Sequence, residues 1–391
     1  FQTIVFPYNN GPVVGEILLY RLWAGTAGVG RHWVLSLVFA ALQAGVAVLV
    51  YGMARRRVGP WPALGVAVLV LFLGRAWETI LFPATLTFVA PALAGCAAWA
   101  ALDGRSRWWA QLVVAILLMV AAVTGGLAPA LLLGLLAEIA LSRRWRWLWA
   151  VGLGAIPLIA WYIAEAGNTG THPGVNLPHL PLWAVNYLIA SAGAVFGLAP
   201  AGGIAVILLA AAGLLLWRRR SPAVSLWTPR SVGLLVTLAV AVATIGAARA
   251  ADTPASASRY LYFPAIPMLL LACEWTQGLT VVRPRLAAAG ALLVVLVALG
   301  LGMQQLRDGK VFYLQHADGT AARIGAMQLA HGPRLVIEPS RLAYTPPVVA
   351  AFIRRYGSAP IDTESRLAGG LPQSRAAADQ VFAAADVRPP G

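Results

Sequence analysis

The chain has 391 residues, of which 60% are hydrophobic and 11% charged, and its mean hydropathy is +0.75. A soluble domain carries about twice this charged fraction, so the composition excludes an ordinary soluble enzyme and indicates a membrane protein. The formal net charge of +15 could suggest a nucleic-acid partner. The basic residues, however, stand in short clusters between apolar stretches, as topology signals do. No nucleic-acid partner is therefore predicted.

Residues 1–31 precede the first long apolar stretch. They open with turn signals around Asn9-Asn10-Gly11-Pro12. They continue with an apolar, helix-like stretch of the kind that lies at a membrane interface. We expect residues 1–31 to form an external loop and an interfacial helix.

Apolar stretches close to the length of a bilayer crossing, about 20 residues, then recur up to residue 303. We predict an all-α, polytopic transmembrane bundle over residues 32–303. Between its spans, residues 165–199 are expected to hold a polar loop and a second interfacial or re-entrant helix. The pattern predicts about ten spans, at residues 32–53, 61–80, 84–102, 108–123, 126–141, 147–164, 200–217, 231–249, 260–276 and 286–303.

The orientation is predicted from clusters of arginine that follow alternate spans. The positive-inside rule makes their side cytoplasmic, so the start of the chain and residues 304–391 are expected outside a bacterial plasma membrane. We expect residues 304–391 to form a small external tail or cap domain. The cytoplasmic cluster residues are Arg55, Arg56, Arg57, Arg105, Arg107, Arg143, Arg144, Arg146, Arg218, Arg219, Arg220, Arg230, Arg283 and Arg285.

The connection between the second and third spans, "GRAWETILFPATLTF", holds Arg75, Trp77 and Glu78 at the predicted outer surface. One interpretation is structural: Arg75 and Glu78 neutralise each other, and Trp77 is an interfacial anchor. The other is functional, because ionisable residues at membrane depth often mark a site. Glu78 would then bind a cation or position an acceptor hydroxyl.

Arg259 begins the stretch "RYLYFPAIPMLLLA" on the same predicted side. It either extends to the headgroup level with Tyr260 in the aromatic belt, or binds a lipid phosphate through its planar fork of donors. Arg249 stands at the other end of the loop and could share a pyrophosphate or phosphodiester with Arg259.

Motifs of soluble enzymes, such as a P-loop or HExxH, are absent from the sequence. No metal ligands are predicted. Glu138 lies near a predicted cytoplasmic end, where we expect it to pair with Arg143 or Arg144. The predicted midplane is almost uncharged, which disfavours a transporter.

The layout resembles the membrane glycosyltransferases of the GT-C type. The resemblance rests on the turn and interfacial helix from Asn9 to Trp23, the first span ending "ARRRVGPWPALG", the second ending in Trp77-Glu78, and "SRYLYFPAIPMLLLA". The segments "RRYGSAP" and "SRAAADQVF" are similar to uncharacterised actinobacterial membrane proteins of this layout.

The resemblance implies that Arg259 serves the carrier phosphate, with Tyr260 beside it, and that Glu78 is an acceptor-side or metal-side carboxylate. A divalent cation would fit the latter role, although no cofactor is assigned. The external turn adds Asn9 and Asn10 to the substrate side. The catalytic acid of such enzymes lies in the first external loop.

In residues 1–31 the acid of that loop could only be Glu16, which sits on the interfacial helix. We therefore expect either lost or altered activity, or a span upstream of Phe1 followed by an external Asp or Glu.

Together these features predict a transferase that moves a sugar from a polyprenyl-phosphate donor to an envelope glycan, lipid or protein. Two alternatives stay open: a lipid or polysaccharide transporter or flippase, and a non-catalytic scaffold for envelope assembly.

Overall fold

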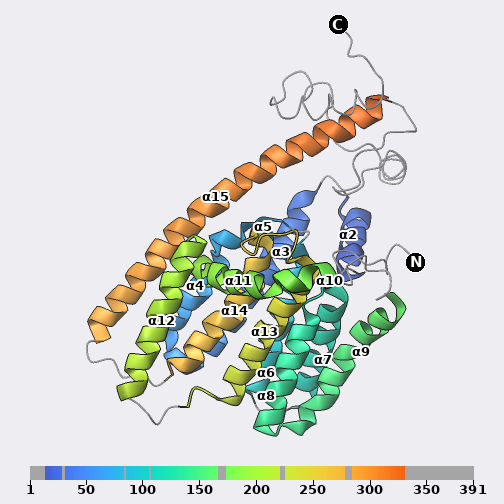
Figure 1. The fold of residues 1–391 in the computed structure, drawn as a ribbon. Coiled ribbons are helices and arrows are strands. Elements are labelled where there is room, and N and C mark those ends of the chain that lie inside the picture. Colours follow the sequence, from blue (N-terminus) through green and yellow to red (C-terminus); the bar gives the residue numbers. More distant parts are fainter. Residues whose placement is uncertain are drawn as a thin grey trace. The chain divides into compact units, whose positions relative to one another are not determined.

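A computed structural model gives the fold and describes residues 14–28, 31–82, 85–104, 107–165, 173–220, 225–277 and 284–330. Within these ranges the regular secondary structure is helical, without a strand (Figure 1). The prediction of an all-α fold is therefore confirmed. Asn9 and Asn10 lie outside the described residues, as do residues 331–391.

The helices follow one another with short connections. Their bounds are α2 Val14–Thr26, α3 His32–Val58, α4 Pro60–Leu71, η1 Gly74–Ala76, α5 Trp77–Leu81, α6 Leu86–Leu102, α7 Trp108–Thr124, α8 Ala128–Ser142, η3 Trp145–Trp147, α9 Leu148–Glu165, α10 Pro173–Asn176, η5 Leu177–His179, α11 Leu180–Val195, α12 Pro200–Arg220, α13 Pro229–Arg249, α14 Ser258–Trp275 and α15 Pro284–Ala330.

The chain divides into two compact units, which differ from the expected division at residues 31/32 and 303/304. The larger unit comprises residues 1–19 and 36–306, and the smaller one residues 20–35 and 307–391. In the smaller unit, the indole N–H of Trp23 donates to the carbonyl of Arg31 at 3.1 Å. Helix α15 continues through residue 304 because no proline interrupts it between Arg285 and Gly332.

Five helical segments of the described residues are long and apolar enough to cross a membrane, or six if one bent pair forms a single span. The five are Trp33–Val58, Pro60–Leu81, Trp145–Ala164, Pro229–Arg249 and Ala288–His316. Each of the ten stretches expected as spans overlaps helical structure, although the stretch 61–80 is broken at Phe72 and Leu73. The count of ten is not confirmed. Helices α6 and α7 have 17 residues each and α8 has 15, which is less than the roughly 20 that cross a bilayer without thinning it.

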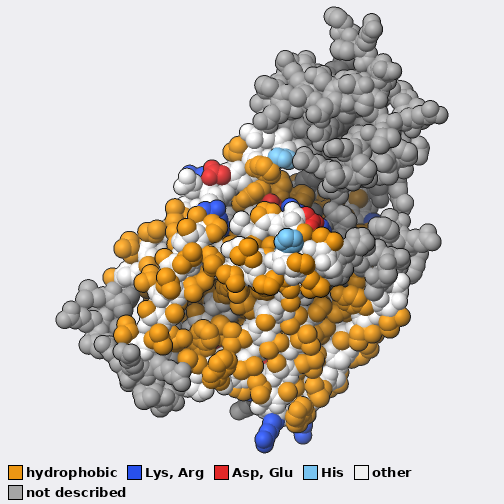
Figure 2. Space-filling view, in the orientation of Figure 1, with side chains coloured by type: hydrophobic (Ala, Val, Ile, Leu, Met, Phe, Trp, Pro, Cys, Tyr) orange, Lys and Arg blue, Asp and Glu red, His pale blue; other side chains and the backbone are white. Residues whose placement is uncertain are grey.

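The surface of the larger unit is rich in exposed apolar side chains. Ile163 is 83% exposed, and Leu209 on α12 is 73% exposed. Figure 2 shows hydrophobic side chains over most of the visible face, with basic side chains at its lower end beneath α8 and α9. So much apolar surface is unfavourable in water and favourable against lipid, which agrees with the composition.

The bent pair consists of α11 and α12. The apolar stretches Gly174–Val195 and Pro200–Leu216 meet at 84°, as in a broken span or a re-entrant loop. Tyr187 and Ser191 on α11 are fully buried. The re-entrant alternative predicted for residues 165–199 therefore fits better than a helix lying on the surface.

A second break separates α4 from η1, where Phe72 and Leu73 leave the helical conformation. Residues 302–305 of α15 contact both breaks. A Cβ on Gly302 would meet the carbonyl oxygen of Phe72, and the side-chain amide of Gln305 donates to the carbonyl of Gly197 at 2.6 Å. Only glycine allows the backbone to approach this closely.

Helices α8 and α13 form the most extensive helix pair of the larger unit. A Cβ on Gly233 of α13 would lie 2.8 Å from the carbonyl oxygen of Gly134 on α8. Small residues at such crossings let helices in membranes approach closely. The approach brings Glu138 of α8 beside Arg230 of α13.

Candidate functional site

The first turn of α14 and the short helix α5 bring Arg259 and Glu78 together. Nε of Arg259 lies 3.1 Å from Oε2 of Glu78, and the two side chains are 47% and 24% exposed. The guanidinium carbon also lies 5.8 Å from the ring centre of Tyr260, within the range of a cation–π contact. Residues 181 positions apart in the chain thus form one accessible ion pair, which we call the outer pair.

Backbone contacts fix both partners of the outer pair. The hydroxyl of Thr79 donates to the carbonyl of Arg259 at 2.9 Å, and the N–H of Glu78 donates to the hydroxyl of Ser258 at 3.4 Å. On the other side of α14, the hydroxyl of Tyr187 donates to the carbonyl of Tyr260 at 2.7 Å. The outer pair therefore stands on a rigid base.

The buried side chain of Gln43, on α3, holds α5 in place. Its side-chain amide donates to the carbonyls of Thr79 and Ile80 at 3.1 and 3.0 Å. Sequence reasoning missed Gln43, Thr79, Ser258 and Tyr187, because each acts through partners at least 36 positions away.

Arg75 lies three residues before Glu78, on η1, and Trp77 begins α5. The structural interpretation had Arg75 neutralise Glu78, but the ion pair described for Glu78 is with Arg259. Nε of Arg75 is buried without a hydrogen-bond partner in the described structure. The pairing expected between Arg75 and Glu78 is therefore replaced by the pairing of Glu78 with Arg259.

Arg249 stands at the other end of the loop that leads to Arg259. Arg249 ends α13 and accepts, through its carbonyl, the N–H groups of Asp252 and Thr253. Its sharing of a phosphate with Arg259 stays a prediction.

Glu16 lies on α2, next to Gly15, which packs against Thr124 at the end of α7. Burial raises the pKa of the Glu16 carboxyl to about 7, because desolvation disfavours its charged form. The catalytic role expected for Glu16 stays a prediction.

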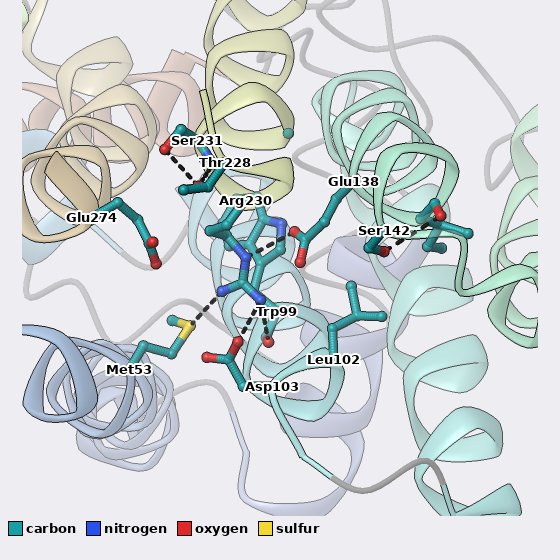
Figure 3. Close-up of polar contacts among 12 residues, drawn as sticks. Met53, Trp99, Leu102, Asp103, Glu138, Ser142, Thr228, Arg230, Ser231 and Glu274 are labelled. Atoms are coloured by element: carbon teal, nitrogen blue, oxygen red, sulfur yellow. Dashed lines mark hydrogen bonds and ion pairs between the residues drawn. The ribbon is translucent and has the colours of Figure 1, made fainter. Parts of the chain in front are cut away.

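The other end of α14 belongs to a buried ionic cluster, which we define as Arg57, Asp103, Glu138, Arg230 and Glu274. The more exposed Arg56 lies at its edge, 3.8 Å from Asp103. Arg230 is the centre of this cluster (Figure 3): its Nε lies 2.8 Å from Glu138, and its Nη2 lies 3.0 Å from Asp103 and 2.9 Å from the carbonyl of Trp99. Arg57 extends the cluster, at 3.3 Å from Asp103 and 2.6 Å from Glu274.

The expected pairing of Glu138 with Arg143 or Arg144 is wrong. Arg143 takes a left-handed conformation, with φ 54°, and ends α8. The chain turns there, and Arg144 donates to the carbonyl of Leu102 instead. Glu138 is left to Arg230, its neighbour across the close crossing of α8 and α13.

Five helices contribute residues to the buried ionic cluster. These residues lie at the ends of α3, α6, α8 and α14 and at the start of α13. All of these ends were predicted on one side of the membrane from the alternation of basic clusters. The outer pair lies at the opposite end of α14, fifteen residues or about 22 Å from Glu274.

Among the described residues, no group of three or more His, Cys, Asp or Glu side chains is placed to hold a metal ion. A role of Glu78 on the side of a divalent cation stays untested.

In the described residues the protein is all-helical, and five of its helical segments, or six with the bent pair, have the length and hydrophobicity of membrane spans. No protein-family model matches the chain, and no curated protein or solved structure matches it either.

Proposed function

We propose that this chain is an integral membrane glycosyltransferase. It would move a sugar from a polyprenyl-phosphate donor to a glycan, lipid or protein of the cell envelope, on the outer face of the bacterial plasma membrane. The observation that supports this proposal is the outer pair: a carboxylate and a guanidinium, 3.1 Å apart and both accessible, on rigid helix ends.

The two groups match the two needs of the reaction. Glu78 takes the proton from an acceptor hydroxyl, whose oxygen forms a bond to the anomeric carbon of the sugar. The bond from that carbon to the phosphate oxygen breaks, and the electron pair stays on the lipid phosphate. Arg259 stabilises the departing phosphate through its fork of donors. Transfer with inversion requires the pair to separate first, because the acceptor and the phosphate lie on opposite faces of the sugar ring.

A second candidate, a lipid or polysaccharide transporter or flippase, is favoured by one observation. The 84° bend between α11 and α12 is the kind of broken helix that many transporters use at their binding sites. In the described part of this break, residues 196–199 carry no charge, whereas transporter sites place helix ends and ionisable groups there. We therefore rank the transferase first.

The test uses the full chain in lipid nanodiscs with a panel of polyprenyl-phosphate-linked pentoses and hexoses and a crude envelope acceptor. We expect release of polyprenyl phosphate, and a fall of about 10²- to 10⁴-fold in that release for Glu78→Gln. Arg259→Lys keeps the charge but loses the fork, and should also release the carrier more slowly. Asp252→Asn, in the exposed loop before α14, is the matched control and should behave as the parent does.

Release that is unaffected by Glu78→Gln would refute the proposed chemistry. Movement of labelled carrier between leaflets without cleavage would instead identify a transporter. If the chain neither cleaves nor moves the carrier, but proteins that make the carrier or the acceptor stay bound to it through purification, the scaffold alternative remains.

A further inference from the structure

We infer that Glu78 is an internal stand-in for the ligand's phosphate, which a lipid phosphate displaces from Arg259 when it binds. This inference rests on the proposed function, because it takes the phosphate site to be Arg259. It adds that the site is closed by its own carboxylate until the ligand arrives.

The outer pair has the properties of an exchangeable contact. Arg259 is 47% exposed and Glu78 24% exposed, and ion pairs in such surroundings contribute little net free energy because water solvates both partners well. The pairs of the buried ionic cluster differ: Arg230 and Glu138 are only 6% and 5% exposed. The outer pair is therefore easier to open than the pair of Arg230 with Glu138, whose side chains are each 7% exposed.

A phosphate competes well for the same guanidinium. It can accept two parallel N–H bonds from arginine. The sugar-linked carrier, a phosphodiester, carries one negative charge, as the carboxylate does, and the released carrier, a monoester, carries up to two. The released carrier should therefore compete with Glu78 more strongly than the sugar-linked carrier does.

The exchange also prepares the site. While Glu78 is paired with Arg259, the guanidinium occupies the carboxylate oxygen Oε2 and keeps it from an acceptor hydroxyl. Once displaced, the carboxylate is free to receive the proton of that hydroxyl. The base would thus become available only when a carrier is bound.

If Glu78 competes with the ligand for Arg259, replacing Glu78 should strengthen ligand binding, whereas replacing an ordinary binding residue weakens it. Glu78→Gln keeps the shape of the side chain but removes the competing charge, so a polyprenyl phosphate should bind about fivefold more tightly than to the parent. Arg259→Ala should bind at least about tenfold more weakly, because the fork is lost. Asp252→Asn removes one negative charge from the exposed loop before α14 and is the control for a general electrostatic effect.

The measurement is equilibrium binding of a fluorescent polyprenyl phosphate to the full chain in phosphatidylcholine nanodiscs, with inorganic phosphate as a competitor in a second arm. Size-exclusion profiles and thermal midpoints confirm that each variant is folded, and Arg259→Lys replaces Arg259→Ala if the latter is not.

Tighter binding by Glu78→Gln than by both the parent and Asp252→Asn supports the exchange. Unchanged or weaker binding by Glu78→Gln, with Arg259→Ala still impaired, overturns the exchange and leaves the proposed function standing. Equal binding by Arg259→Ala and the parent overturns both. If inorganic phosphate displaces the fluorescent polyprenyl phosphate at an equal concentration, the assignment of the ligand to a lipid is overturned.

Discussion

Replacing Arg230 by methionine should destabilise the larger unit strongly. Arg230 is 6% exposed and holds Glu138 at 2.8 Å and Asp103 at 3.0 Å. Methionine fills much of the same volume but removes the cation, which leaves Glu138 buried without the partner described for it, whereas Asp103 keeps Arg57 at 3.3 Å. Removing one member of a buried ion pair typically costs about 3–5 kcal/mol, because the remaining charge is desolvated and unpaired.

The free energy of unfolding can be followed by tryptophan fluorescence in detergent mixed with increasing SDS. Arg146→Met is the matched control, since Arg146 is exposed and its replacement should cost less than about 0.5 kcal/mol. The double variant Arg230→Met/Glu138→Gln should recover part of the loss, because one stranded charge is gone. If Arg230→Met and Arg146→Met unfold within 1 kcal/mol of each other, where about 3 are expected, the reasoning is refuted.

Two further predictions concern packing and pH. Gly302→Val should cost about 1–3 kcal/mol, because the new side chain meets the carbonyl oxygen of Phe72. Gly300→Val, whose Cβ meets nothing within 4 Å, should cost less, and equal losses in SDS unfolding would contradict the packing argument. The pKa of Glu16 is raised to about 7 in the folded chain, so its protonation stabilises the fold fully below about pH 4.5, and this contribution is lost as the pH rises through 7. Glu16→Gln should therefore flatten the fall of the thermal midpoint between pH 5 and 8, whereas an unchanged slope would exclude Glu16 as its source.

Composition and hydrophobic runs were enough to predict the fold class. The predicted spans overlap helical structure because a long apolar stretch has few alternatives in lipid. The number of spans was not predictable in the same way. Helices such as α8, with 15 residues, are apolar enough for a membrane but short, and whether they cross it depends on tilt and on their neighbours.

The pairing of charges was predictable only in part. Alternation of the spans put Glu78 and Arg259 on one side, and the structure brings them into contact. The alternation of the spans could not identify Arg230 as the partner of Glu138, because sequence spacing reveals only neighbours three or four residues apart on one helix. That partner lies 92 positions away and depends on how closely Gly134 and Gly233 let two helices approach.

The anchoring of α14 at both ends has a consequence for the rate at which the outer pair can respond. Glu274 is held by Arg57, and the carbonyls of Arg259 and Tyr260 are held by Thr79 and Tyr187. Because the backbone of α14 is fixed in this way, the low-energy motion that remains to Arg259 is rotation about its side-chain bonds. Rotamer changes of exposed side chains take picoseconds to nanoseconds. Capture of an anion at this end should therefore be limited by diffusion of the ligand within the bilayer, with no slow conformational step before it.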